Sequence, residues 1–199
     1  MLEIFLRNRF VVLYFIPFII GSLSVLSFEP FNLTILNFII LPLLFYLTVY
    51  INKKSKGFYR KKPYKKNLFL LGLFFGFGFY FSGISWITNS LTFDDNFKFL
   101  IPIALILIPL FLSLFNAFTI LLIGPYIKFN FISLIYFSGG LALSDYLRAK
   151  LFTGFPWNLW AYSTSGLTEI LQILNLTGLF LYNLIAISLF IMPVILFFR

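Results

Sequence analysis

The side chains best suited to chemistry lie in residues 144–163, one polar stretch of an otherwise apolar chain. Asp145 and Arg148 are three residues apart, a spacing that makes them neighbours on a helix, where they can form an ion pair. A guanidinium group also binds phosphate and carboxylate groups in a bidentate manner. Two interpretations are therefore open: Arg148 binds a lipid phosphate or a substrate carboxylate, or the pair only fixes the end of a helix.

A tight turn follows this pair in the sequence Thr-Gly-Phe-Pro-Trp, residues 153–157. Gly154 permits backbone angles that other residues avoid, and Pro156 fixes the next turn. Aromatic side chains are enriched where a protein meets the membrane interface. We therefore expect this loop to lie at headgroup depth and to form a surface for an acyl chain or another domain. Its four aromatic residues are Phe155, Trp157, Trp160 and Tyr162.

The composition excludes several kinds of site. The 199 residues contain no Cys and no His, which excludes a thiol nucleophile, a disulfide, a Ser-His-Asp triad and the usual metal clusters. We therefore expect no metal site and no cofactor in this chain. The net charge of +9 is no argument for a nucleic-acid partner, because Lys and Arg in a membrane protein mark its cytoplasmic loops.

The polar stretch must be positioned by membrane-spanning helices. Hydrophobic residues make up 61% of the chain and charged residues 11%, whereas a soluble domain has about 25% charged residues. The apolar runs are long enough to cross a bilayer, which takes about 20 residues per helix. The sequence predicts an all-α, polytopic transmembrane helix bundle without a soluble domain. Six spans are expected, at about residues 10–28, 33–51, 68–90, 99–124, 131–147 and 170–198.

The distribution of charge predicts how these spans are oriented. Residues 51–67 carry eight Lys or Arg and no acidic residue, which is typical of a loop retained in the cytoplasm. A cytoplasmic amino terminus then places 12 of the 15 Lys and Arg inside the cell and residues 144–163 outside. The same cations could also form a patch that binds anionic lipid.

Small residues recur at helical spacing in the third predicted span. Gly72 and Gly76 are four residues apart, as are Gly78 and Ser82. This spacing lets the backbones of neighbouring transmembrane helices approach closely. We therefore expect tight helix packing along this span, with Trp86 near its outer end at the membrane interface.

Within residues 144–163 the chain resembles bacterial apolipoprotein N-acyltransferases. Asp-Tyr-Leu-Arg, Thr-Gly-Phe-Pro-Trp and Ala-Tyr-Ser are similar to that family's Glu-x-Leu-Arg, Thr-Gly-Phe-Pro-Trp and Gly-Tyr-Ser signature. Residues 26–31 resemble its Pro-containing turn after the first span, and residues 76–86 resemble its Gly-rich span that ends in Trp. Asp145 and Ala161 depart from the pattern, with a shorter acid and a larger residue than the family's Glu and Gly.

The resemblance implies a multi-pass protein of the bacterial inner membrane. Such enzymes move an acyl chain from a phospholipid donor to the α-amino group of the diacylglyceryl-cysteine of a prolipoprotein. They do so through a thioester on a Cys, assisted by Glu and Lys, in a nitrilase-like domain outside the membrane. Without a Cys, this chain is expected to be inactive alone. We expect it to be the membrane portion of a longer enzyme, ending one helix before the catalytic domain that it anchors.

Three residues are predicted to border the lipid or substrate site: Arg148, Trp157 and Trp86. The structural motif around them is expected to comprise Asp145, Gly154, Phe155 and Pro156. Two alternative functions remain open: a non-catalytic membrane scaffold or partner protein complete at Arg199, and a small transporter. A further span and a nitrilase-like domain in the reading frame after Arg199 would favour the enzyme. Broken helices at mid-membrane would favour the transporter.

Overall fold

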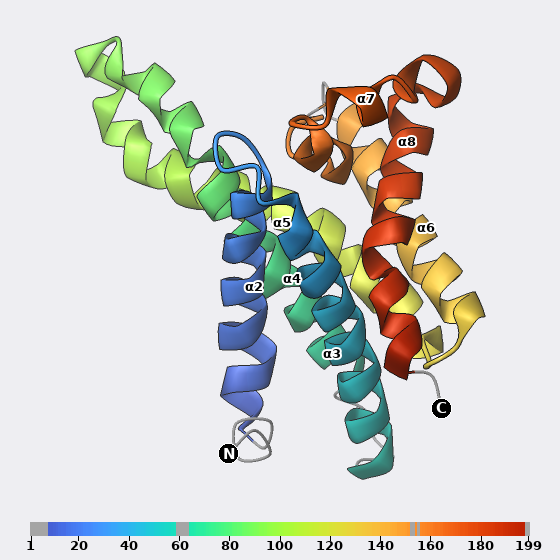
Figure 1. Cartoon of the computed structure of the whole chain (residues 1–199). Helices are drawn as coiled ribbons and strands as arrows, with labels where there is room; N and C mark the ends of the chain where they lie inside the picture. The colour runs from blue at the N-terminus through green and yellow to red at the C-terminus, as the bar shows by residue number, and fades with distance from the viewer. Residues whose placement is uncertain (1–7, 59–63, 152–153, 155, 198–199) are drawn as a thin grey trace.

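The computed structural model describes residues 8–58, 64–151, 154 and 156–197, and the regular secondary structure of these residues is helical. The predicted all-α fold class is therefore confirmed for the described part of the chain. Figure 1 shows the helices as a bundle from which one helical arm projects. The α-helices are α2 (Ile16–Ser24), α3 (Asn37–Phe58), α4 (Tyr64–Ile84), α5 (Ile101–Ile123), α6 (Phe131–Lys150), α7 (Thr168–Leu171) and α8 (Leu174–Ile191).

Short 3-10 and π segments extend most of these helices. Because they continue the chain's helical path, several segments are longer than the α-helices alone. Four are long and apolar enough to cross a membrane: Thr34–Lys53, Tyr64–Thr92, Asp95–Tyr126 and Leu174–Leu196, and Val11–Ser27 is a shorter apolar helix. The extending segments are η1 (Val11–Phe15), η2 (Val25–Ser27), η3 (Thr34–Leu36), η4 (Ser85–Thr92), η5 (Asp95–Leu100), η6 (Gly124–Tyr126) and η8 (Met192–Phe197). A further 3-10 segment, η7 (Trp160–Thr164), lies between α6 and α7 and extends neither helix.

Helices α3 and α8 are among those that differ in extent from the predicted spans. Helix α3 continues to Phe58, into the cationic segment, because Lys is a good helix former and an apolar run does not mark the end of a helix. The last predicted span is divided into α7 and α8. Within α8, Gly178 has φ 69° and ψ 167°, which interrupts the helical geometry near its beginning.

Helix α4 is packed tightly between α5 and α2. A Cβ atom at Gly72 would lie 2.6 Å from the carbonyl oxygen of Asn116 in α5. A Cβ atom at Gly78, toward the other side, would overlap the carbonyl oxygen of Phe18 in α2. The glycines therefore allow α4 to approach both neighbours at backbone distance, as their spacing predicts.

Replacing Gly78 by alanine is expected to destabilise the bundle, because the added methyl group would overlap α2. Overpacking of this kind costs about 1–3 kcal/mol. Gly139 in α6 is a matched control, since a Cβ atom there would meet no atom within 4 Å. Alanine gains about 1 kcal/mol of helix propensity over glycine at either position. Thermal unfolding in detergent should show a lower midpoint for Gly78→Ala but not for Gly139→Ala. Equal midpoints would contradict the predicted clash.

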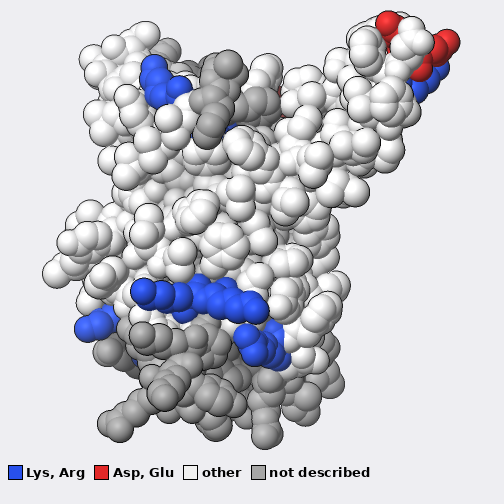
Figure 2. All heavy atoms as spheres, turned by 180° about the vertical axis from the view of Figure 1, so that it is seen from behind, with Lys and Arg blue, Asp and Glu red and all other residues white. Residues whose placement is uncertain are grey.

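The two ends of the bundle differ in charge. Figure 2 shows a band of Lys and Arg side chains across one end and acidic side chains at the tip of the projecting arm, which η4 and η5 form. At this tip Lys98 forms an ion pair with Asp95. Two contacts order the cationic end: Arg9 donates to Asn67 at 2.9 Å, and Lys53 lies 5.2 Å from the ring centroid of Phe129. Residues 59–63 of the cationic segment, like Arg199, lie outside the described residues.

Candidate functional site

The candidate site is built around the loop that joins α6 to α7, at the end of the bundle where α6 ends and α8 begins (Figure 1). Gly154 has φ 81°, and a Cβ atom there would lie 2.5 Å from the carbonyl oxygen of Ala149. Only glycine fits this geometry without strain, in agreement with its expected role in shaping the turn. Pro156 follows on the exposed surface, whereas Phe155 lies outside the described residues.

Asp145 and Arg148 form the ion pair that their spacing predicts. The Nη2 atom of Arg148 lies 3.1 Å from an Asp145 carboxylate oxygen, and the two side chains are 1% and 7% exposed, respectively. The Nη1 atom of Arg148 donates to the carbonyl oxygen of Trp157 at 2.7 Å, and its Cζ atom lies 5.2 Å from the Tyr80 ring centroid. The guanidinium is therefore enclosed by protein and holds the loop from below.

Asn183 of α8 extends this buried network. Its Nδ2 atom donates to the second carboxylate oxygen of Asp145 at 2.9 Å, and its Oδ1 atom accepts from the backbone amide of Ala161 at 2.9 Å. One buried side chain thus connects α6, α8 and the loop. Sequence reasoning did not identify Asn183. The available signal was a polar amide inside an apolar span, where such residues tend to be functional or to have a partner.

Trp160 points into the bundle. It is 3% exposed and stacks on Phe79 of α4, with ring centroids 5.1 Å apart and an interplanar angle of 3°. Phe75 and Phe28 also contact its ring. This differs from the expectation that the aromatic residues of the loop lie in lipid. The rings of α4 and of the turn after η2 give the indole a packed apolar environment inside the protein.

Hydrogen bonds attach η7 to helices on two sides. On the α3 side, Thr34 donates to the carbonyl oxygen of Ser163 at 2.5 Å, and Asn37 donates to its hydroxyl at 2.7 Å. On the α8 side, the hydroxyl groups of Thr164 and Tyr182 lie 2.6 Å apart. Because these partners come from separate helices, η7 forms a fixed platform.

The three segments singled out in the sequence, residues 26–31, 76–86 and 144–163, meet at this platform. Residues 26–31 reach it through Phe28, which contacts Trp160, and through Glu29, which accepts from Ser165 at 3.2 Å. Residues 76–86 supply the rings beneath it. Residues distant in the chain therefore form one structural unit.

Trp86 and Trp157 form the exposed part of the site. Their ring centroids lie 5.4 Å apart at an interplanar angle of 71°, an edge-to-face contact. The residues are 51% and 50% exposed. Indole presents an apolar face and one N–H donor, which suits contact with the boundary between acyl chains and headgroups. The structure thus brings together the three predicted site residues: Arg148 binds the Trp157 carbonyl, and Trp157 packs on Trp86.

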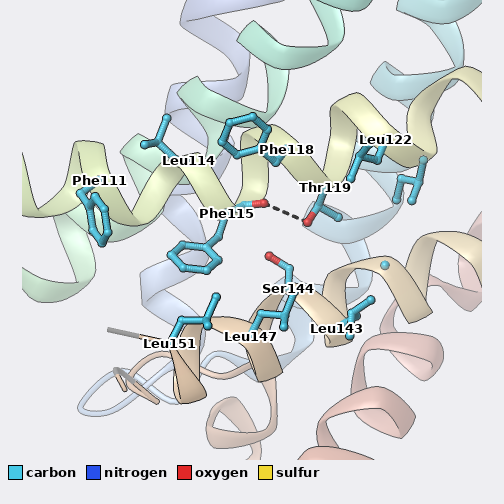
Figure 3. A pocket seen from close by; sticks show the side chains of 12 residues that line it. Phe111, Leu114, Phe115, Phe118, Thr119, Leu122, Leu143, Ser144, Leu147 and Leu151 are labelled. Carbon is cyan, nitrogen blue, oxygen red and sulfur yellow. Dashed lines mark hydrogen bonds between the residues drawn. The ribbon is translucent and has the colours of Figure 1, made fainter. Parts of the chain in front are cut away.

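A cavity of about 460 Å³ lies next to the loop, between α5 and α6. Figure 3 shows Phe111 and Leu151 at one end of it and Leu122 and Leu143 at the other. The lining is almost entirely hydrocarbon and aromatic. The described residues contain no group of three or more acidic side chains that could hold a metal ion. The chemistry of the site is therefore suited to apolar ligands.

Comparison with known proteins shows which family this sequence belongs to. The family model for the apolipoprotein N-acyltransferase N-terminal domain matches residues 20–192. Apolipoprotein N-acyltransferase of Brucella melitensis is 31% identical over 183 residues, which cover 90% of this chain and 34% of the relative. The Rhodopseudomonas palustris enzyme is 30% identical over 182 residues, 91% of this chain and 33% of that protein. The chain spans about a third of the length of these curated relatives.

Proposed function

We propose, since this chain belongs to the apolipoprotein N-acyltransferase N-terminal domain family, that it forms the membrane domain of an enzyme that acylates bacterial lipoproteins. The proposed reaction moves an acyl chain from a phospholipid to the α-amino group of the diacylglyceryl-cysteine of a prolipoprotein. The chain anchors the catalytic part of the enzyme and shapes the entrance for lipid. The observation that carries this proposal is the family match over residues 20–192, which includes the whole loop and its buried network.

We assign the acyl-transfer step itself to a part of the enzyme outside these 199 residues. A thioester intermediate requires a Cys sulfur, and the sequence contains no Cys. In this proposal the chain contributes the membrane anchor, the platform and the approach for lipid, and the chain alone is inactive.

We further propose that the protein is a multi-pass protein of the bacterial inner membrane with its cationic end in the cytoplasm. Cytoplasmic loops carry an excess of Lys and Arg. Asp94 and Asp95 lie at the beginning of η5, and the acidic side chains at the tip of the arm lie away from the cationic band in Figure 2. This orientation places the platform and the Trp86–Trp157 pair at the periplasmic surface.

Within this proposal, the two exposed tryptophans contact the lipid or lipoprotein substrate, and Arg148 acts through Trp157. The support is geometric: both indoles are half exposed, whereas the guanidinium is enclosed and bonded to the Trp157 carbonyl. Arg148 is then a positioning residue that sets the height and direction of the Trp157 backbone.

A chimera tests the proposed function. Residues 20–192 replace the matching segment of the Brucella melitensis relative, and the chimera is produced in bacteria depleted of their own apolipoprotein N-acyltransferase. We expect mass spectrometry of a lipoprotein's amino-terminal peptide to show restored N-acylation. This chain alone, and the relative without its matched segment, should leave the peptide unacylated.

A chimera that is present in the membrane at the normal level but leaves lipoproteins unacylated would contradict the proposal. Trp157→Ala in the chimera is expected to reduce N-acylation at an unchanged protein level. Phe93→Ala serves as its matched control, because Phe93 is 91% exposed on the projecting arm.

A further inference from the structure

We propose that the cavity between α5 and α6, here called the α5–α6 groove, holds one acyl chain of a membrane phospholipid, with the ester end at Leu151 and the methyl end near Ile123. The inference rests on the proposed function, because it gives the lipid entrance a location. It concerns a face of the bundle that the buried network and the tryptophan pair do not use.

The lining selects for hydrocarbon. The groove has a volume of about 460 Å³, within the range of roughly 300–1,000 Å³ that is usual for ligand sites. Among its lining residues, the hydroxyl of Thr119 donates to the carbonyl oxygen of Phe115 at 2.9 Å, so this donor needs no ligand. Ser144 is the other hydroxyl-bearing residue of the lining, and the lining contains no charged side chain. An unbranched acyl chain meets these conditions, and a headgroup does not.

The groove is open to the surrounding lipid. Phe118 and Leu122 of α5 are 52% and 67% exposed, and Leu143 of α6 is 57% exposed. In a membrane-spanning bundle such side chains face acyl chains. Phospholipid therefore has direct access to this face, and we assign it as the ligand of the groove.

The two ends of the groove give the bound chain a direction. At one end, Leu151 is the residue that follows α6, and the backbone amide of Gly154 donates to its carbonyl oxygen at 2.9 Å. That end therefore adjoins the loop that carries Trp157. At the other end, α6 approaches α5, because a Cβ atom at Gly140 would lie 2.9 Å from the Cδ1 atom of Ile123. A lipid whose chain lies in the groove has its ester beside the platform and its methyl end inside the membrane.

Photo-crosslinking of the 199-residue chain in nanodiscs tests this assignment. The probe is phosphatidylethanolamine with a diazirine on one acyl chain, diluted into unlabelled phosphatidylethanolamine and phosphatidylglycerol. A diazirine near the ester is expected to label Leu151 and Phe111, and one near the methyl end is expected to label Leu122 and Leu143. Peptide mass spectrometry reads out the labelled positions.

Leu147→Trp fills the groove and is expected to reduce labelling of its lining at least several-fold. Leu189→Trp is the matched control, because Leu189 is 48% exposed on α8 and lies outside the groove. Leu143→Trp provides a second filling variant if thermal unfolding shows that Leu147→Trp does not fold. Labelling spread evenly over α5, α6 and α8, or unchanged by the filling variants, would mean that the lipid is only annular and would overturn the proposal.

Absence of label from the groove, with normal labelling elsewhere, would also overturn the proposal, since another protein segment would then occupy the groove. The chimera separates this failure from failure of the proposed function. Restored N-acylation without groove labelling removes the acyl-chain site and leaves the membrane-domain role intact. Groove labelling without restored N-acylation would support the acyl-chain site and contradict the proposed membrane-domain role.

Discussion

Asp145→Leu is expected to lower the free energy of unfolding by about 3–5 kcal/mol, because it leaves the guanidinium of Arg148 buried without its carboxylate. The substitution also removes the acceptor for Asn183. Equilibrium unfolding in mixed detergent micelles measures the loss. Because this substitution leaves an enclosed charge without its counterion, we expect its effect to be among the largest in the molecule.

The double variant Asp145→Leu/Arg148→Met is the control for this prediction. Replacing both members of a buried ion pair by apolar residues removes the uncompensated charge and is often close to neutral. Here the Trp157 carbonyl and the Asn183 amide lose partners, each at about 1–3 kcal/mol if left unsatisfied. We therefore expect the double variant to be less destabilised than the sum of the single variants, which is the sign of direct coupling.

The same series separates the two interpretations of Arg148. If the guanidinium served a lipid phosphate at the surface, removing Asp145 would change stability by less than about 1 kcal/mol, as for an exposed ion pair. Arg148→Ala would then reduce lipid binding without destabilising the fold. A small effect of Asp145→Leu would thus contradict the buried-clamp geometry.

Trp160→Ala is expected to destabilise the protein by about 3–5 kcal/mol, the usual range for removing a buried aromatic side chain. The indole is 3% exposed and stacks on Phe79, so its loss opens a cavity beneath η7. Trp160→Phe retains a ring and should recover much of the loss. Thermal and detergent unfolding of the two variants provide the measurement.

Trp157→Ala is the matched control, since Trp157 lies in the same loop and is 50% exposed. Truncation there is expected to change stability by no more than about 0.5 kcal/mol, as at other surface positions. Equal destabilisation by the two substitutions would show that the loop does not distinguish an inward from an outward tryptophan. A smaller effect of Trp160→Ala than of Trp157→Ala would reverse the assignment altogether.

These two sets of variants also distinguish residues that stabilise the fold from residues that contact the substrate. In the chimera, Asp145→Leu and Trp160→Ala should reduce N-acylation together with the amount of folded protein. Trp157→Ala should reduce N-acylation alone. A positioning role and a contact role therefore give different ratios of activity to protein level.

Much of the fold follows from the sequence, because in a membrane protein a long apolar run determines a whole helix. An apolar run long enough to cross the bilayer must satisfy its backbone hydrogen bonds internally, so it becomes a helix whatever its neighbours are. Helix ends are less determined. Helix α3 continues to Phe58 and α8 is interrupted at Gly178, because local propensity and backbone geometry act after the apolar run has set the span.

For residues 144–163, the sequence was not sufficient to predict which side chains face the interior of the bundle. The i, i+3 spacing of Asp145 and Arg148 determined their pairing, because helix geometry makes such residues neighbours. Which tryptophan faces inward depended on Phe79, and whether the acid was satisfied depended on Asn183, both distant in the chain. An irregular loop has no periodicity to assign its side chains to a face. The sequence therefore determined which residues form the platform, and only tertiary packing decided that Arg148 and Trp160 hold it from inside while Trp86 and Trp157 remain exposed.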